Sequence, residues 1–235
     1  MDDTTRQRNY YERTAAHYEA MHVQSDDEHG IALALFAGMA RKLGAQSVLD
    51  IGAGTGRALE LLAPELPHAR LVGIEPVDGL REIGYSKGIS KVQLIGGSGE
   101  ELPFADDSFD FVIETGVLHH VPNPAKVVAE MVRVARLGVM ISDSNKFGQG
   151  SRSVRLFKSV VDRLGLWTPF IWIQTKGKMS KWNEGDGLYY SYSVFDNVDA
   201  LSSKFPRKFV ANTRPLAGHS LRYGSPQVCV VAIRE

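Results

Sequence analysis

The chain has 235 residues, of which 43% are hydrophobic and 23% charged, and its 27 Lys and Arg balance 27 Asp and Glu. This composition is that of an ordinary soluble protein with room for one substantial α/β domain, and it excludes an intrinsically disordered chain. Zero net charge removes the bulk electrostatic attraction that nucleic-acid binding depends on, so no nucleic-acid partner is expected. The single cysteine, Cys229, excludes an internal disulfide and a cysteine-rich metal site.

The distribution of apolar and charged residues gives further expectations. The longest fully apolar stretch has ten residues, at 31–40, whereas a membrane span needs roughly 20. The N-terminus is acidic where a signal peptide would be basic. We therefore expect no membrane span and, by default, a cytoplasmic location. Residues 148–235 carry 13 Lys and Arg against 6 Asp and Glu; this basic part could steer an anionic substrate, or it could simply pack against the acidic remainder.

The first predicted elements are two helices. One is expected over about residues 5–21, and Ser25-Asp26-Asp27-Glu28 has the pattern of a capping box at the start of the second. The second helix carries Ile31, Leu35 and Met39 on one face and is expected to end at Gly44. These helices form a predicted N-terminal cap over about residues 1–44.

The sequence VLDIGAGTGR at residues 48–57 predicts a strand followed by a ligand-binding loop. Its glycines stand at alternate positions, Gly52, Gly54 and Gly56, and Asp50 precedes them. Glycines let the backbone turn sharply and approach a ligand, and the next helix offers its N-terminal amides, so a nucleoside-containing cofactor is expected. Glu75 ends the next predicted strand, where a carboxylate suits ribose hydroxyls and disfavours the 2′-phosphate of NADP.

This segment resembles motif I of the class I S-adenosylmethionine-dependent methyltransferases. The third glycine comes one residue earlier than in the dinucleotide fingerprint G-x-G-x-x-G, which argues against NAD. The resemblance implies that Asp50 orients the methionine ammonium group of the cofactor. It also implies S-adenosylmethionine as the cofactor and S-adenosylhomocysteine as its product.

The resemblance extends over about residues 8–147. Residues 96–121 are similar to the segment that follows these motifs in small-molecule methyltransferases, where an aspartate often reaches the adenine amine; Ser98 and Gly99 stand there in this chain. Ser98 with Glu101 also fits a capping box, and both interpretations stay open. Glu114 and Thr115 begin the loop that lines the sulfonium pocket in the family.

Two tyrosines near the N-terminus match aromatic positions of a segment that closes over the cofactor in similar enzymes. They are Tyr11 and Tyr18, of which Tyr18 is the better candidate for a cofactor contact. Their helical spacing with Ala15 fits ordinary core packing equally well.

Strands and helices alternate from residue 47 onward. Strands are expected at 47–51, 71–75, 91–95, 109–114 and 139–145, with helices from Arg57, from about Asp78, and from Pro124 with Asn123 as its N-cap. This alternation predicts a parallel sheet with helices on both faces, which binds ligands at the carboxyl ends of its strands. The resemblance implies a Rossmann-like, mostly parallel, seven-stranded sheet. Its sixth and seventh strands are expected at 207–214 and 227–235, and the last strand is expected to be antiparallel.

One domain over residues 1–235 is expected, with an insertion at about 147–195 after the fifth strand. The insertion is rich in aromatic residues and is interpreted as a helical lid over an apolar acceptor or sugar, although packing against the sheet would explain the same residues.

The candidates for a general base are His119 and His120, which follow the fourth strand, and Asp143, at the end of the fifth. A histidine here could equally support the loop by hydrogen bonding. The histidines lack H-x-x-x-H spacing, so no metal site is expected. The function predicted is methyl transfer to a small-molecule acceptor, preferably at oxygen of an anionic or glycosylated biosynthetic intermediate. An NAD-dependent oxidoreductase and a non-catalytic cofactor-binding module remain alternatives.

Overall fold

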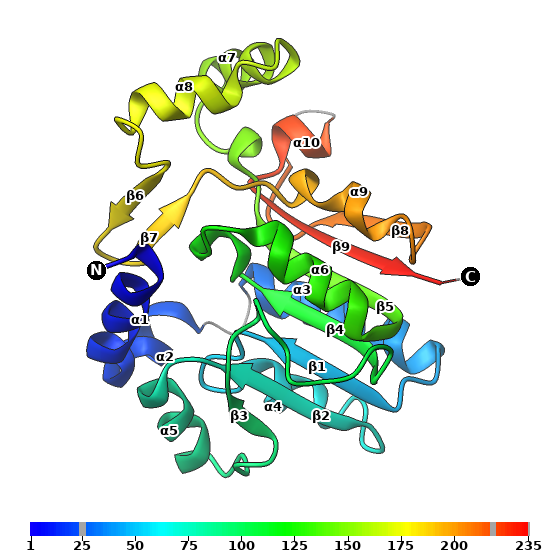
Figure 1. Ribbon diagram of the computed structural model, residues 1–235. Helices are drawn as coiled ribbons and strands as arrows, with labels where there is room; N and C mark the ends of the chain where they lie inside the picture. The colour runs from blue at the N-terminus through cyan, green and yellow to red at the C-terminus, as the bar shows by residue number, and fades with distance from the viewer. Residues whose placement is uncertain (24–26, 217–219, 235) are drawn as a thin grey trace.

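Seven strands form one sheet in the computed structural model, which describes residues 1–23, 27–216 and 220–234 (Figure 1). The strand order is β3-β2-β1-β4-β5-β9-β8. Strands β1 to β5 pair in parallel, whereas β9 runs antiparallel to both neighbours. The bounds are β1 Ser47–Ile51, β2 Arg70–Glu75, β3 Leu94–Gly96, β4 Phe109–Thr115, β5 Ala135–Ser144, β8 Arg207–Asn212 and β9 Gln227–Ile233. The predicted fold class is confirmed.

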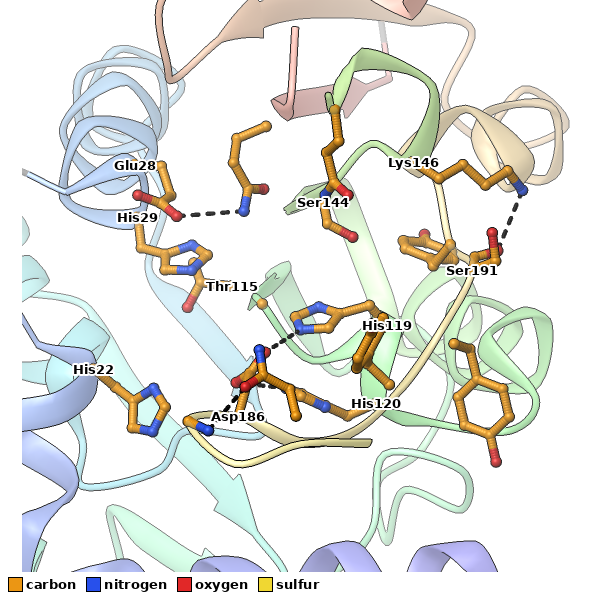
Figure 2. Close-up of a pocket in the computed structure, with 18 of the residues that line it drawn as sticks. His22, Glu28, His29, Thr115, His119, His120, Ser144, Lys146, Asp186 and Ser191 are labelled. Atoms are coloured by element: carbon orange, nitrogen blue, oxygen red, sulfur yellow. Dashed lines mark hydrogen bonds and ion pairs between the residues drawn. The ribbon is translucent and has the colours of Figure 1, made fainter. Parts of the chain in front are cut away.

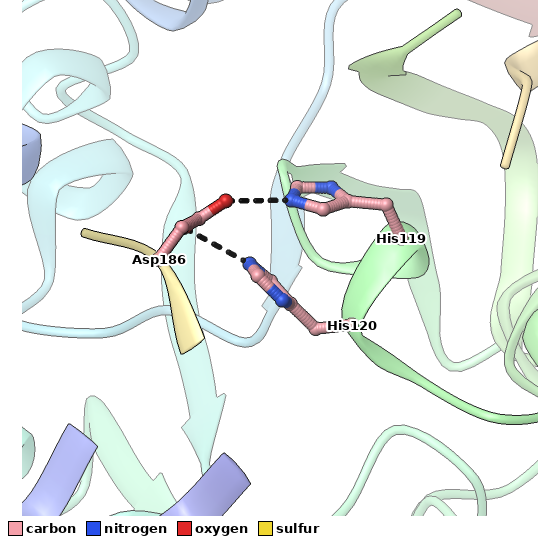
Figure 3. A group of neighbouring side chains, drawn as sticks. All are labelled: His119, His120 and Asp186. Carbon is pink, nitrogen blue, oxygen red and sulfur yellow. Dashed lines mark ion pairs between the residues drawn. The ribbon is translucent and has the colours of Figure 1, made fainter. Parts of the chain in front are cut away.

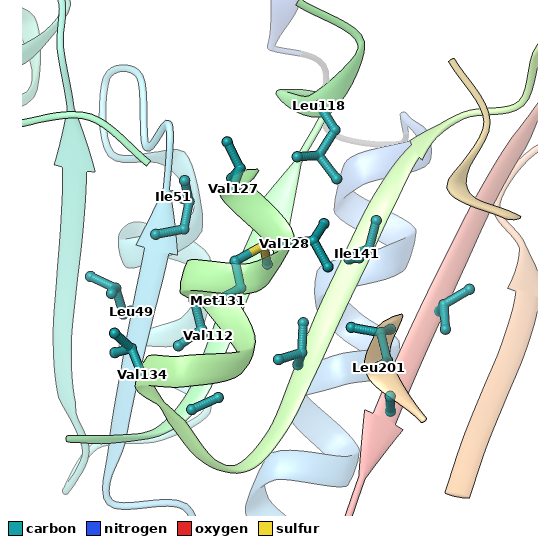
Figure 4. Packing of buried hydrophobic residues seen from close by; sticks show 14 of the residues in the cluster. Leu49, Ile51, Val112, Leu118, Val127, Val128, Met131, Val134, Ile141 and Leu201 are labelled. Carbon is teal, nitrogen blue, oxygen red and sulfur yellow. The ribbon is translucent and has the colours of Figure 1, made fainter. Parts of the chain in front are cut away.

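Helices cover both faces of this sheet because successive strand residues alternate between two apolar cores. In β4, Val112 belongs to one core, and Phe111 and Ile113 belong to the other. Figure 4 shows the first core, in which α6 places Met131 over the sheet. The helices that pack around the sheet are α3 Glu28–Lys42, α4 Arg57–Leu62, α5 Asp78–Ser86, α6 Pro124–Val134 and α9 Val198–Leu201.

The N-terminal helices and the insertion lie beyond the carboxyl ends of the strands. Figure 1 shows the hairpin of β6 and β7 beside α1, and α7 and α8 apart from the sheet. Two hydrogen bonds join α1 to the hairpin: Tyr10 Oη donates to the Glu184 carbonyl at 2.8 Å, and Leu188 N donates to Gln7 Oε1 at 2.6 Å. The bounds are α1 Asp3–Thr14, α2 Tyr18–His22, α7 Arg152–Arg163, α8 Trp167–Gln174, β6 Ser180–Asn183, β7 Gly187–Tyr190 and α10 Leu221–Gly224.

Several predicted boundaries differ from the structure. The helix expected over 5–21 is interrupted by a 3-10 turn at Ala15–His17 between α1 and α2. Strand β3 begins at Leu94 instead of residue 91, because Ser90 and Gln93 form a turn closed by a 2.9 Å backbone hydrogen bond. Strand β5 begins at Ala135, directly after α6. The insertion contains a hairpin as well as helices.

Two expected helix caps have different outcomes. Asp27 caps α3 by accepting hydrogen bonds from the backbone of His29 and Gly30, whereas Ser25 and Asp26 lie outside the described residues. No helix begins at Ser98; its Oγ accepts a hydrogen bond from Glu100 N at 3.3 Å within a turn. The capping-box alternative for Ser98 is therefore wrong. Among the described helices, none is long and apolar enough to span a membrane.

Asn145 directly follows β5 and joins the sheet to later segments of the chain by side-chain hydrogen bonds. Its buried amide donates to the carbonyls of Arg222 and Ser225, both at 2.8 Å, and its Oδ1 accepts from Ser193 Oγ at 2.9 Å. Asn145→Ala leaves these groups without partners, so we expect the free energy of unfolding to fall by about 2–4 kcal/mol. Chemical denaturation measures the loss. Asn212→Ala, at an exposed position of β8, should change stability little; an equal effect of both variants would contradict the assignment.

Candidate functional site

Two cavities of about 940 and 130 Å³ adjoin each other at the carboxyl ends of β1, β2 and β4. Parallel strands bring their carboxyl ends to one edge of a sheet, which is why predicted residues from separate motifs meet here. Six residues line both cavities and so mark the junction: Tyr11, Tyr18, Gly52, Thr115, Gly116 and His120.

The smaller cavity is lined by Glu75, Ser98 and Gly99. The Glu75 carboxylate accepts hydrogen bonds from the backbone of Gly54 at 3.0 Å and of Val77 at 2.9 Å. Burial raises the pKa of Glu75 to about 7, although these two amides oppose the change. Each carboxylate oxygen accepts one of these two bonds, and a carboxylate oxygen can accept more than one, so Glu75 retains capacity for hydroxyl donors.

Asp50, at the end of β1, lines the larger cavity and is 3% exposed. Its Oδ1 has no hydrogen-bond partner among the described residues. Burial, and then the nearby Glu75, raise the pKa of Asp50 well above its usual value. A cationic group placed beside this carboxyl would favour its ionised form and satisfy the unpaired oxygen.

The glycine loop brings its backbone close to the tyrosines of the N-terminal helices. Gly52 and Gly54 have φ values of +66° and +54°, a left-handed conformation that glycine adopts readily. A Cβ on Gly54 would lie 3.1 Å from Tyr18 Oη. Gly54 and Gly56 shape the loop without lining either cavity, whereas Gly52 lines both.

His119 lies between the carboxylates of Asp143 and Asp186. Figure 3 shows Asp186 facing both His119 and His120. The Nδ1 of His119 is 2.6 Å from Asp143 Oδ1, and its Nε2 is 3.5 Å from Asp186 Oδ2. Burial alone would lower the pKa of the imidazole, but Asp143 and Asp186 outweigh burial and raise the pKa of His119 to about 10. The ring is therefore protonated at neutral pH in this arrangement.

His120 supports the same cluster from its other side. Its Nε2 is 3.3 Å from Asp186 Oδ1 and 3.0 Å from Tyr11 Oη, and its Nδ1 is 2.7 Å from the Leu188 carbonyl. His119, His120 and Asp186 could hold a metal ion, since one ligand atom of each lies within 4.8 Å of the others. In the structure the protonated His119 pairs with Asp186, and His120 lies within hydrogen-bonding distance of the same carboxylate.

Two predicted residues lie behind the cavity walls. Asp143 is fully buried, and its carboxylate also accepts from the His119 backbone at 3.2 Å; burial would raise the pKa of Asp143, but His119 lowers it. Glu114 is fully buried, accepts from Val117 N at 3.0 Å, and has its pKa raised well above the usual value by burial and by Asp143. Both position the loop after β4.

Asp186 and Gln7 are site residues that the sequence analysis did not identify. Asp186 comes from the turn of the insertion hairpin, and Gln7 Nε2, on α1, lies 3.1 Å from His120 Nδ1. The Gly185-Asp186-Gly187 sequence indicates a turn. The residues that Asp186 contacts, His119 and His120, lie more than 60 residues away along the chain, so the local sequence does not reveal this contact.

The walls of the larger cavity combine aromatic and basic side chains from the insertion and its surroundings. Figure 2 shows Lys146 and Ser191 on one side of this cavity and His29 and Glu28 on the other. Lys146 pairs with Asp196 at 2.6 Å, and Arg214 pairs with Glu28 at 2.8 Å. Large aromatic residues that line the cavity are Phe157, Trp167, Phe170, Tyr189, Tyr190 and Tyr192.

Comparison with known proteins identifies the central part of the chain. Residues 49–142 match the family model described as a methyltransferase domain, which confirms the resemblance predicted from the motifs. An uncharacterized methyltransferase of Mycobacterium avium is 35% identical over 103 residues, 43% of this chain and 40% of the relative. A demethylmenaquinone methyltransferase of Listeria welshimeri is 34% identical over 97 residues, 39% of this chain and 41% of the relative. The chain thus spans about two fifths of the length of the curated relatives it matches.

Solved structures share the fold over a longer range. The magnesium protoporphyrin IX methyltransferase ChlM of Synechocystis, solved with bound S-adenosylmethionine, superposes with a TM-score of 0.62. The alignment covers 100% of this chain and 98% of that one at 15% identity. At this identity the likeness supports the fold.

The charge on Asp186 is expected to contribute to the raised pKa of His119. Asp186→Asn removes one of the two carboxylates, so the pKa of His119 should fall from about 10 by roughly 1 to 3 pH units. NMR titration of the imidazole resonances measures this change. Glu184→Gln, in the same hairpin, should leave the pKa unchanged; no change in the Asp186 variant would contradict the ion pair.

Proposed function

We propose that this chain, which carries a methyltransferase domain over residues 49–142, transfers a methyl group from S-adenosylmethionine to a small-molecule acceptor. The observation that carries the proposal is the junction of two cavities at Gly52, Thr115 and His120, beside the carboxylates Asp50 and Glu75. The smaller cavity can take the cofactor's adenosine and the larger cavity can take the acceptor, so that methyl donor and acceptor meet at the junction.

The residues present fit S-adenosylmethionine. The unpaired Oδ1 of Asp50 suits the methionine ammonium group, and Glu75 suits the ribose hydroxyls. Ser98 and Gly99 line the adenosine side, and Tyr18 and Thr115 the junction. When bound, this cofactor supplies an activated methyl group on its sulfonium. The protein's own contribution is to hold donor and acceptor in reactive geometry, which can supply on the order of 7–11 kcal/mol.

Within this proposal the larger cavity binds the acceptor, and the methylated atom is an oxygen of an anionic or glycosylated biosynthetic intermediate. The aromatic walls of this cavity suit flat or sugar-like groups, and Lys158 and Lys181 add positive charge to the lining beside the ion-paired Lys146 and Arg214. By name, the relatives include a demethylmenaquinone and a magnesium protoporphyrin IX methyltransferase, both of which act on small organic molecules. Within this proposal, residues 1–44 form a cap, residues 147–195 form a lid, and the cytoplasm is the location.

We assign to His119 the role of general base, which takes the proton from the hydroxyl group of the methyl acceptor. Asp143 would hold the ring through Nδ1 and stabilise the imidazolium, and His120 would support the loop. Because Nε2 faces Asp186 and the ring is protonated there, the acceptor hydroxyl must take the place of Asp186 before His119 can act as a base. The proton on Nε2 would first leave to solvent as Asp186 is displaced, and the neutral Nε2, with Nδ1–H still held by Asp143, would then take the proton of the acceptor hydroxyl.

Binding measurements test the cofactor assignment. Glu75→Ala removes the acceptor for the ribose hydroxyls, so affinity for S-adenosylmethionine should fall about ten- to a hundredfold, equivalent to roughly 1.5–3 kcal/mol. Calorimetric titration with S-adenosylmethionine, S-adenosylhomocysteine and NAD measures this and tests the oxidoreductase alternative. Glu82→Ala, at an exposed position of α5, is the matched control, and circular dichroism verifies folding. Tighter binding of NAD, or an unchanged affinity in the Glu75 variant, would overturn the assignment.

Turnover tests the role of His119. An acceptor screen with methyl-labelled cofactor first distinguishes an enzyme from a module that only binds, since only an enzyme forms labelled product. His119→Gln should then lower kcat by about 10² to 10⁴ while affinity for S-adenosylmethionine stays the same. His68→Gln, remote from both cavities, should retain activity. Full activity of the His119 variant would exclude it as the base.

A further inference from the structure

Helix α7 turns its polar side toward the protein and its apolar side toward solvent. Ser159 is its buried residue, and Asp162 Oδ2 accepts from Tyr223 Oη at 2.9 Å on the inward side. On the outward side, Leu156 is 67% exposed, and Leu164, just after the helix, is 65% exposed. This is the reverse of the usual surface helix, whose apolar stripe faces the core.

Helix α8 extends the same exposed apolar surface. Trp172 is 59% exposed and Ile173 is 70% exposed. The two helices contact each other through Phe157 and Phe170, whose ring centroids are 5.4 Å apart, and Figure 1 shows the pair apart from the sheet. We define the apolar face as the exposed large apolar residues of this pair and its connection: Val154, Leu156, Phe157, Val160, Leu164, Leu166, Trp172 and Ile173.

Exposed basic residues lie at both ends of α7 and just after α8. Residues 151–181 contain seven Lys and Arg and one acid, Asp162, which is itself paired with Arg222 at 2.9 Å. The basic flank consists of the exposed cations in this segment: Arg152, Arg163, Lys176, Lys178 and Lys181. A partner that covers the apolar face must therefore carry negative charge at its rim.

We propose that the apolar face and basic flank bind the surface of an anionic phospholipid membrane. A helix with Trp, Phe and Leu on one side and Lys and Arg beside them lies in the headgroup region, where apolar groups enter the acyl boundary and cations meet phosphates. A second copy would bring two basic flanks together, which like charges oppose. Nucleic acid offers no counterpart to an apolar surface of this extent.

The apolar face is continuous with the larger cavity, because Val154 and Phe157 belong to both. A membrane-bound protein would therefore present the wall of this cavity at the lipid surface. Binding itself does not depend on methyl transfer, so it is measured without cofactor or acceptor.

Vesicle flotation tests the proposal on the full chain. We expect partitioning onto vesicles of phosphatidylcholine with 30% phosphatidylglycerol to exceed that onto pure phosphatidylcholine at least tenfold, and to weaken as salt is added. Trp172→Ser combined with Ile173→Ser should lower binding to the anionic vesicles at least tenfold. Lys176→Glu combined with Lys178→Glu should do the same.

Matched variants provide the controls. Leu61→Ser with Val92→Ser makes the same exchange at exposed positions remote from α7 and α8, and Lys42→Glu with Lys91→Glu removes the same charge elsewhere. Both should bind as the unaltered protein does. Absent or charge-independent binding, or an equal loss in the controls, would overturn the proposal. So would a dimer, seen by sedimentation, that the Trp172 and Ile173 exchanges abolish, since the face would then belong to a second copy.

Discussion

The site depends on one geometric constraint: parallel strands end at the same edge of the sheet. Glu75 ends β2, and Asp50, the next-to-last residue of β1, pairs in register with Gly73, two residues before Glu75, so the two buried carboxyl groups lie near each other. Burial raises the pKa of both, and backbone amides stabilise only Glu75. Asp50 Oδ1, which has no hydrogen-bond partner within the described ranges, favours a cationic ligand at this position, and the cofactor assignment uses this property.

The second group of carboxylates connects the insertion to the sheet. Asp143 belongs to β5, whereas Asp186 belongs to the hairpin, and His119 contacts both. The hairpin thereby contributes directly to the charge of the imidazole. His119, predicted as a general base from its position after β4, is protonated in this arrangement because Asp143 and Asp186 raise its pKa to about 10. The charge at this wall of the larger cavity therefore depends on a segment outside residues 49–142.

The sheet and most of its polar edge were predictable because they follow from local patterns. Apolar runs that end in Asp50, Glu75 and Glu114 predict strands and their common edge, and Asn123 before Pro124 marks a helix start. The break at residues 15–17 was not predictable, since the apolar spacing continues across it. Asp186 was missed because its role depends on contacts between distant parts of the chain, which a local pattern does not contain. The inward polar side of α7 was missed for the same reason: its periodicity indicates two sides but not which one faces the protein.

The hydrogen bonds between α1 and the hairpin have a consequence for how ligands enter. Gln7 accepts from Leu188 and lies beside His120, and Tyr10 donates to Glu184, so the first helix and the hairpin are fastened to each other across more than 170 residues of chain. Neither can swing away alone without breaking these bonds. A displacement of the hairpin away from the larger cavity would therefore carry α1 along, and with α1 a wall of the smaller cavity.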